Sequence, residues 1–172
     1  ASIAPTVGAV ADDAGSITGS LATGDVTDDT QPTVTGTGTP GETVTLYDTS
    51  TDPATVIGTA VVGENGEWNV TPTDPLGEGE HTLQVTTTDE AGNESELSTP
   101  AVKVVVDTTA SIAPTVGAVA DDAGSITDPL ATGDVTDDTQ PTVTGTGTPG
   151  ETVTLYDTST DPATVIGTAV VG

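Results

Sequence analysis

The side chains with the clearest chemical potential are aspartates in a stretch rich in Gly, Ser and Thr near the start of the chain. They are Asp12, Asp13, Asp25, Asp28 and Asp29. Calcium takes about six to eight oxygen ligands from carboxylates and backbone carbonyls, and a flexible loop can wrap around the ion. The residue types and their clustering therefore predict calcium binding in this stretch.

The same acidic stretch occurs a second time. Residues 110–172 repeat residues 1–63 and differ only where Asp128-Pro129 replaces Gly19-Ser20. The second set of candidate calcium ligands is Asp121, Asp122, Asp134, Asp137 and Asp138. Near-identity over a period of domain size is typical of a tandem array of independent modules.

Two further groups of polar side chains are expected at the ends of a module. If the first strand crosses the module from end to end, the acidic stretch lies where the last strand exits, beside Asp107. Asp89, Glu90 and Asn93 should then occupy a loop at the opposite end. In an array the two groups would meet at each junction, and calcium ions there could bridge neighbouring repeats.

A second interpretation of these aspartates needs no metal. Aspartate favours turns because its carboxylate accepts hydrogen bonds from nearby backbone amides. In addition, no segment has the EF-hand pattern, with glycine at the sixth and glutamate at the twelfth loop position. Both interpretations remain open at the level of the sequence.

The overall composition restricts the possible partners. Asp and Glu number 27 against one Lys or Arg, so the formal net charge is -26, which excludes nucleic acid as a partner. The absence of cysteine excludes disulfides, zinc thiolate sites and cysteine nucleophiles. The sequence also has no run of about 18 apolar residues, so membrane insertion is not expected. Bound cations would offset the self-repulsion of the chain.

Catalysis is not expected. His81 is the single histidine, it alternates with Leu83 and Val85 as a strand residue near the edge of a core does, and no nucleophile-elbow motif is present. Pairs of carboxylates that could serve a glycosidase are expected by chance in so acidic a chain. We therefore predict that the protein is not an enzyme.

The elements that position these residues are β-strands. Apolar and polar residues alternate in several segments, and turn sequences such as Glu64-Asn-Gly separate them. The expected strands cover residues 5–10, 32–36, 43–47, 56–62, 67–70, 82–86 and 101–106. About seven strands predict an all-β fold, an antiparallel immunoglobulin-like sandwich repeated every 109 residues. The predicted domains are a complete repeat at 1–107, a linker at 108–110 and a truncated repeat at 111–172.

Several motifs at fixed spacing resemble a known family. They are Asp28-Asp-Thr-Gln-Pro-Thr-Val-Thr-Gly, Pro40-Gly-Glu-Thr-Val-Thr-Leu-Tyr, Gly66-Glu-Trp, Gly79-Glu-His-Thr-Leu and Thr88-Asp-Glu-Ala-Gly-Asn-Glu-Ser. This pattern is similar to the bacterial immunoglobulin-like repeats of giant RTX-type adhesins. The resemblance implies an extracellular extender on the bacterial surface that becomes rigid when calcium binds between modules and projects a distal ligand-binding domain. The chain has no glycine-rich RTX nonapeptide, so export and adhesion rest on the resemblance alone.

Two alternatives concern partners. Runs of Thr-X-Thr, as in residues 33–39, could present an ordered hydroxyl face to a glycan or to ice, although threonine is also common on the solvent side of strands. The truncated second repeat leaves strand edges and apolar faces open, so it should either borrow strands from another chain or stay loosely packed.

Overall fold

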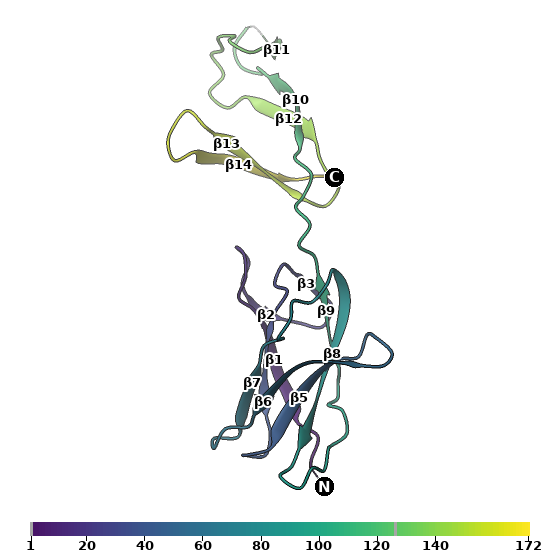
Figure 1. Ribbon diagram of the computed structural model, residues 1–172. Coiled ribbons are helices and arrows are strands. Elements are labelled where there is room, and N and C mark those ends of the chain that lie inside the picture. The colour runs from purple at the N-terminus through teal and green to yellow at the C-terminus, as the bar shows by residue number, and fades with distance from the viewer. Residues whose placement is uncertain (1, 126) are drawn as a thin grey trace. The chain divides into compact units, whose positions relative to one another are not determined.

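The computed structural model describes residues 2–125 and 127–172, and every regular element in this part of the chain is a β-strand. The chain divides into two compact units, residues 1–109 (unit 1) and residues 110–172 (unit 2) (Figure 1). None of the described residues forms a helix long and apolar enough to cross a membrane. The prediction of an all-β fold is confirmed.

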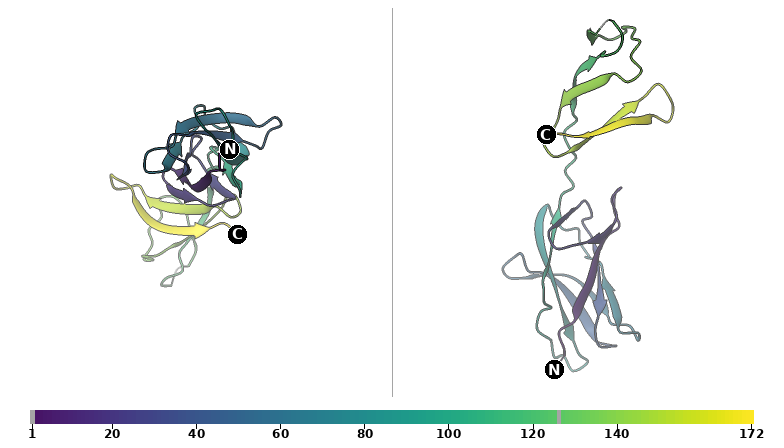
Figure 2. Two further views of the ribbon diagram at one scale, coloured as in Figure 1. Left: turned by 90° about the horizontal axis from the view of Figure 1, so that it is seen from below. Right: turned by 180° about the vertical axis from the view of Figure 1, so that it is seen from behind.

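Unit 1 consists of two sheets. The first has the order β2-β1-β4-β7, and the second has the order β3-β9-β8-β5-β6. The view from behind shows the two sheets of unit 1 facing each other as a sandwich (Figure 2). The strands are β1 (Thr6–Asp12), β2 (Gly19–Leu21), β3 (Asp25–Thr27), β4 (Thr33–Thr37), β5 (Thr43–Asp48), β6 (Thr55–Val61), β7 (Glu67–Val70), β8 (Gly79–Thr88) and β9 (Val102–Val106).

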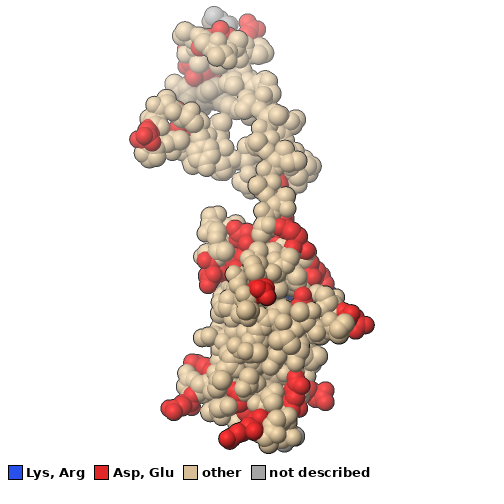
Figure 3. Space-filling model, in the orientation of Figure 1, with Lys and Arg blue, Asp and Glu red and all other residues tan. Residues whose placement is uncertain are grey.

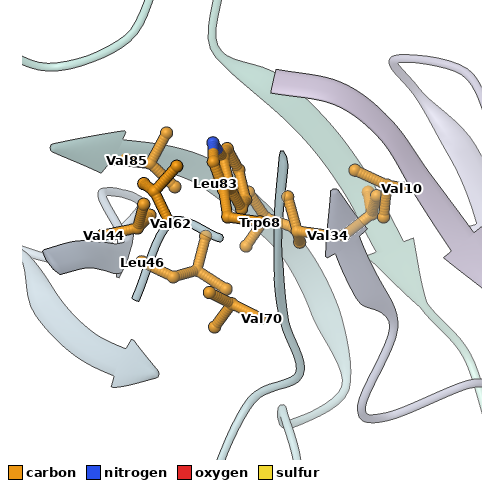
Figure 4. Close-up of a cluster of buried hydrophobic side chains, with 10 residues drawn as sticks. Val10, Val34, Val44, Leu46, Val62, Trp68, Val70, Leu83 and Val85 are labelled. Atoms are coloured by element: carbon orange, nitrogen blue, oxygen red, sulfur yellow. The ribbon is translucent and has the colours of Figure 1, made fainter. Parts of the chain in front are cut away.

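The alternation of side chains along the strands explains the core of unit 1. In β5, Val44 and Leu46 are buried while Thr43 is exposed, because successive side chains point to opposite faces of a sheet. Trp68 of β7 and Leu83 of β8 lie among valines contributed by both sheets (Figure 4). Branched aliphatic side chains and one tryptophan thus form a continuous core in a chain of low aromatic content.

Gly36 leaves room for its neighbours in the first sheet. A Cβ atom at Gly36 would collide with the backbone carbonyl of Thr6 and with the indole ring of Trp68. The position therefore tolerates no side chain, which explains a glycine in the middle of β4.

The main difference from the predicted strands lies in the acidic stretch. It contains two additional short strands, β2 and β3, so the described residues of unit 1 form nine strands instead of about seven. Each is three residues long, which is too short for a recognisable alternation. Furthermore, β3 pairs in parallel with β9, far away in the sequence, and all other ladders are antiparallel.

Unit 2 repeats the first part of this architecture. Its sheets have the orders β11-β10-β12 and β13-β14. The pairing of β10 with β12 has the same irregular register as the pairing of β1 with β4. Its strands are β10 (Thr115–Ala120), β11 (Pro129–Leu130), β12 (Thr142–Thr146), β13 (Thr152–Asp157) and β14 (Thr164–Val170). The described residues of unit 2 form no counterparts of β7, β8 and β9.

Candidate metal sites

We call residues 12–29 the acidic loop; its centre is a hydrogen-bond network around Thr27. The Thr27 hydroxyl donates to Asp12 Oδ2 at 2.7 Å and accepts the backbone N–H of Asp29 at 3.0 Å. The remaining Asp12 oxygen accepts the N–H of Ala14 at 3.0 Å. One hydroxyl therefore joins two aspartates that are separated by most of the loop.

The other candidate ligands of the acidic loop surround this network. Asp29 Oδ2 accepts the N–H of Asp13 at 3.3 Å, so the two halves of the loop are tied together. The carboxylate of Asp28 lies directly against the backbone of Gly15, where a side chain would collide with it. Asp25 accepts the N–H of Ala22 at 2.8 Å. Asp13 and Asp28 thus lie near the Asp12–Asp29 centre, whereas Asp25 belongs to a separate turn.

Two of these carboxylates are buried without a cationic side chain. Asp12 is 6% exposed and Asp29 is 4% exposed. Lys103 pairs with Glu80 at 2.7 Å, and His81 pairs with Asp48 at 2.7 Å, so both side chains that can carry positive charge are engaged elsewhere. A buried carboxylate is costly unless it is protonated, paired or bound to a metal.

Asp107 lies beside the acidic loop. Because β3 and β9 are parallel neighbours, the chain leaves β9 next to the end of β3, and the N–H of Asp107 donates to the carbonyl of Thr27 at 2.9 Å. The Asp107 carboxylate accepts the N–H of Thr109 at 3.0 Å and is exposed. The position is the one expected from the sequence.

The opposite end of unit 1 holds the second predicted group. Asp89 accepts the backbone N–H of Asn93 at 2.8 Å and both of its oxygens accept the Asn93 side-chain amide. These hydrogen bonds lower the pKa of Asp89. The bond from the Asn93 side chain has the larger effect, and the bond from the backbone N–H has the smaller one. Glu90 is exposed in the same turn, and Ser2 donates to the Asn93 carbonyl at 3.1 Å. This loop therefore adjoins the start of the chain.

The acidic side chains gather toward the two ends of unit 1. On the face shown in Figure 3, red patches mark the end with the acidic loop and the opposite end, and most of the surface between them is tan. Both ends of unit 1 therefore carry negative charge on this face.

The second acidic loop, residues 121–138, repeats the network of the first. Thr136 donates to Asp121 Oδ2 at 2.7 Å and accepts the N–H of Asp138 at 2.9 Å. The N–H of Asp122 donates to Asp138 at 3.3 Å. Asp137 lies against Gly124, and Asp134 accepts the N–H of Ala131 at 2.8 Å, again in a separate turn. The network therefore forms without a neighbouring counterpart of β9.

The carboxylates are arranged around backbone donors instead of around a common centre. Within residues 2–125 and 127–172, no three His, Asp or Glu side chains lie close enough together to hold a metal ion. The hydrogen bonds to Asp12, Asp25 and Asp29 are those of turn-forming aspartates. Calcium binding by these residues therefore stays a prediction.

An ion pair between the buried Asp48 and the half-buried His81 was not predicted from the sequence. His81 Nδ1 lies 2.7 Å from Asp48 Oδ2, and His81 Nε2 lies 2.8 Å from the carbonyl oxygen of Gly77. Only the doubly protonated imidazolium can donate to both acceptors. Asp48 also accepts hydrogen bonds from Thr82 and from both the N–H and the hydroxyl of Ser50. The single histidine in strand register was the only signal in the sequence, and nothing indicated its partner.

The pKa values agree with an ionised pair. Burial by itself would lower the pKa of His81, but the hydrogen bonds to Asp48 and Gly77 outweigh it and raise that pKa. Burial would likewise raise the pKa of Asp48, but the hydrogen bonds from His81, Ser50 and Thr82 lower it. The pair holds the end of β5 against the start of β8.

The comparison with protein families agrees with this fold. Among solved structures, the chain is similar to the BSP domain of a biofilm-associated protein, with 25% sequence identity and a TM-score of 0.40. That match covers 64% of this chain and 15% of the other, so the chain spans a small part of that protein's length. No curated protein matches the sequence. The family model of the bacterial Ig-like domain matches residues 4–108, which is most of the chain, and the chain therefore belongs to the bacterial Ig-like domain family.

Proposed function

We propose that this chain is part of an extender of a bacterial surface protein, a stalk of tandem Ig-like modules that calcium makes rigid. Membership of the bacterial Ig-like family and near-identical tandem copies support a spacer of repeated modules. In this proposal the parent protein is a secreted adhesin, and a domain elsewhere in it binds the target. The repeats supply length and stiffness.

The observation that carries the calcium part of the proposal is the burial of Asp12 and Asp29. Both carboxylates are shielded from water in a chain whose cationic side chains are occupied elsewhere. The same is true of Asp121 in the second acidic loop, which is 5% exposed. A bound divalent cation would neutralise these groups, since carboxylate and carbonyl oxygens are the ligands that calcium prefers.

The residues present fit such an ion in their chemistry. Asp12 and Asp29 would contribute the buried oxygens, while Asp13, Asp28 and Asp107 lie at the same end of unit 1 and would complete the ligand set. Backbone carbonyl groups of the acidic loop are further candidate ligands for the ion. Asp107 is followed within a few residues by the next repeat, so an ion that includes it would restrict the connection between repeats.

Thermal unfolding of the chain in calcium and in EDTA tests the ion sites. We expect calcium to raise the melting temperature, because a ligand that binds only the folded state stabilises it by about 2.7 kcal/mol at a hundredfold excess over its Kd. The double variant Asp12→Asn, Asp121→Asn should lose most of this response. Asp52→Asn with Asp161→Asn is the matched control, since both of these aspartates are exposed in the hairpin loops. Equal melting temperatures in calcium and EDTA would refute calcium binding.

Small-angle scattering tests the role of Asp107 in stiffness. In calcium, the Asp107→Ala chain should show a broader distribution of distances than the unchanged chain, because the exit from β9 loses a ligand. The melting temperature should stay nearly the same, since the Asp107 side chain is exposed and accepts only the N–H of Thr109. Asp52→Ala is the control for the loss of one charge. Unfolding of unit 1 by Asp107→Ala would show that the residue has a structural role instead.

A further inference from the structure

Asn65 lies in the hairpin loop between β6 and β7 and is followed by a glycine. An asparagine side chain can react with the backbone nitrogen of the next residue, and a glycine there offers the least hindrance because it has no Cβ atom. The other asparagines of the chain, Asn69 and Asn93, precede Val70 and Glu94, whose side chains crowd this approach. Because Asn65 is also exposed to water, the reaction is expected there first.

The reaction is a deamidation. The backbone nitrogen of Gly66 forms a bond to Asn65 Cγ, and the bond between Cγ and Nδ2 breaks. The Gly66 amide proton passes to a base in the solvent, and Nδ2 takes up a proton from water and leaves as ammonia. One water molecule then opens the resulting succinimide ring at either of its two carbonyl groups. The products are aspartate and isoaspartate at position 65, so the only co-reactant is water.

The folded loop restrains the attacking nitrogen. Gly66 has a φ of 80°, and its N–H donates to the carbonyl of Gly63 at 2.9 Å. The N–H of Gly63 donates in turn to the carbonyl of Glu67 at 2.9 Å. These two hydrogen bonds around a glycine in the left-handed region are typical of a three-residue hairpin loop. The Gly66 nitrogen can therefore attack only when the loop opens locally.

Glu67 restrains the side chain that is attacked. Asn65 Nδ2 donates to Glu67 Oε2 at 2.7 Å, and Asn65 Oδ1 accepts the backbone N–H of Glu67 at 3.1 Å. The charged acceptor strengthens the bond to the nitrogen that must leave. Glu64 is the other acidic residue of the loop, and its exposed side chain makes no hydrogen bond within the part of the chain that the structure describes.

We propose that Asn65 is a deamidation site and that the hydrogen bond from its side chain to the Glu67 carboxylate slows the reaction in the folded protein. The modification is irreversible, so it accumulates with the time that the loop spends open. Isoaspartate lengthens the main chain of the loop by one atom, three residues before the buried Trp68. This inference depends neither on calcium nor on the role as an extender.

The test incubates the full chain at neutral pH and follows deamidation by mass spectrometry of its peptides. Deamidation should occur at Asn65 ahead of Asn69 and Asn93, and faster in urea than in the folded chain. Glu67→Ala should raise the rate in the folded chain about five- to tenfold, the factor expected for the loss of one such hydrogen bond. Glu64→Ala is the matched control, because it removes the same charge from the same loop and should leave the rate unchanged.

A conservative variant separates the hydrogen bond from the charge. Glu67→Gln keeps an oxygen that accepts from Asn65 Nδ2, so its rate should stay close to that of the unchanged chain. Urea unfolding followed by Trp68 fluorescence should give the same midpoint for Glu67→Ala and Glu64→Ala. Earlier deamidation at Asn69 or Asn93 would overturn the assignment of the site. Equal rates for Glu67→Ala and Glu64→Ala, equal acceleration by Glu67→Gln and Glu67→Ala, or an acceleration matched by a loss of global stability would overturn the role of Glu67.

Discussion

Replacing Leu46 with alanine should lower the free energy of unfolding of unit 1 by about 2 to 5 kcal/mol, the usual cost of removing a fully buried leucine side chain. Leu46 is 0% exposed and packs in the core formed by both sheets. The large effect is expected because the core depends on a few aliphatic side chains, and the space left by the leucine is enclosed by β-strands that cannot easily move together.

Leu155→Ala is the matched control for this prediction. The sequence around Leu155 is identical to that around Leu46, but Leu155 faces an open hollow of unit 2. Urea unfolding followed by tryptophan fluorescence separates the two units, because Trp68 is the single tryptophan and lies in unit 1. The Leu155→Ala chain should unfold by this probe as the unchanged chain does. A loss below about 1 kcal/mol for Leu46→Ala would contradict the observed packing.

Replacing Asp48 with alanine should destabilise unit 1 by about 1 to 3 kcal/mol, because the half-buried His81 ring and the backbone N–H of Thr82 lose their hydrogen-bond acceptor. The change leaves His81 without its carboxylate and also removes the acceptor of Ser50 and Thr82. Asp157→Ala is the matched control, since Asp157 is the exposed counterpart of Asp48, and its recorded hydrogen bonds among the described residues come from Ser159. Unfolding followed by Trp68 fluorescence should show a large effect for Asp48→Ala alone.

The pH dependence of stability provides the check on the His81–Asp48 pair. Because the folded-state pKa of His81 is raised, its contribution is complete below the unfolded value of about 6.5 and is lost as the pH rises through the raised value. Because the pKa of Asp48 is lowered, its contribution is present above about 3.9 and is lost as the pH falls through the lowered value. The free energy of unfolding should therefore decrease as the pH rises from about 6.5 through the raised pKa of His81. In His81→Gln this decrease should be absent, and a persistent decrease would assign it to another group.

The strands of the sandwich could be predicted from the sequence because their signals are local. Alternation in residues 43–47 and 67–70 predicts the buried side chains that the structure has in β5 and β7. The two short strands β2 and β3 could not be predicted in this way. β3 exists as a strand because β9 lies beside it, and this pairing joins residues almost eighty positions apart.

The candidate metal sites also combine features that are local in the sequence with features that only the tertiary structure brings together. The hydrogen bonds around Thr27 recur around Thr136 in unit 2, where no counterpart of β9 is present, so the acidic loop folds through contacts within its own sequence. In contrast, the parallel pairing of β3 and β9 brings Asp107 beside the loop, and the pairing of β5 with β8 brings His81 to Asp48.

The two copies separate what the sequence determined from what the tertiary structure decided. The residues of β4, β5 and β6 form the same strands and registers again in β12, β13 and β14, and both acidic loops form the same network around a threonine, because these features depend on neighbours within the same half of the repeat. Leu46 and Asp48 are buried while Leu155 and Asp157 are not, although their local sequences are the same. Burial depends on the strands that pack against a residue from elsewhere in the chain, and β7, β8 and β9 supply them only in unit 1.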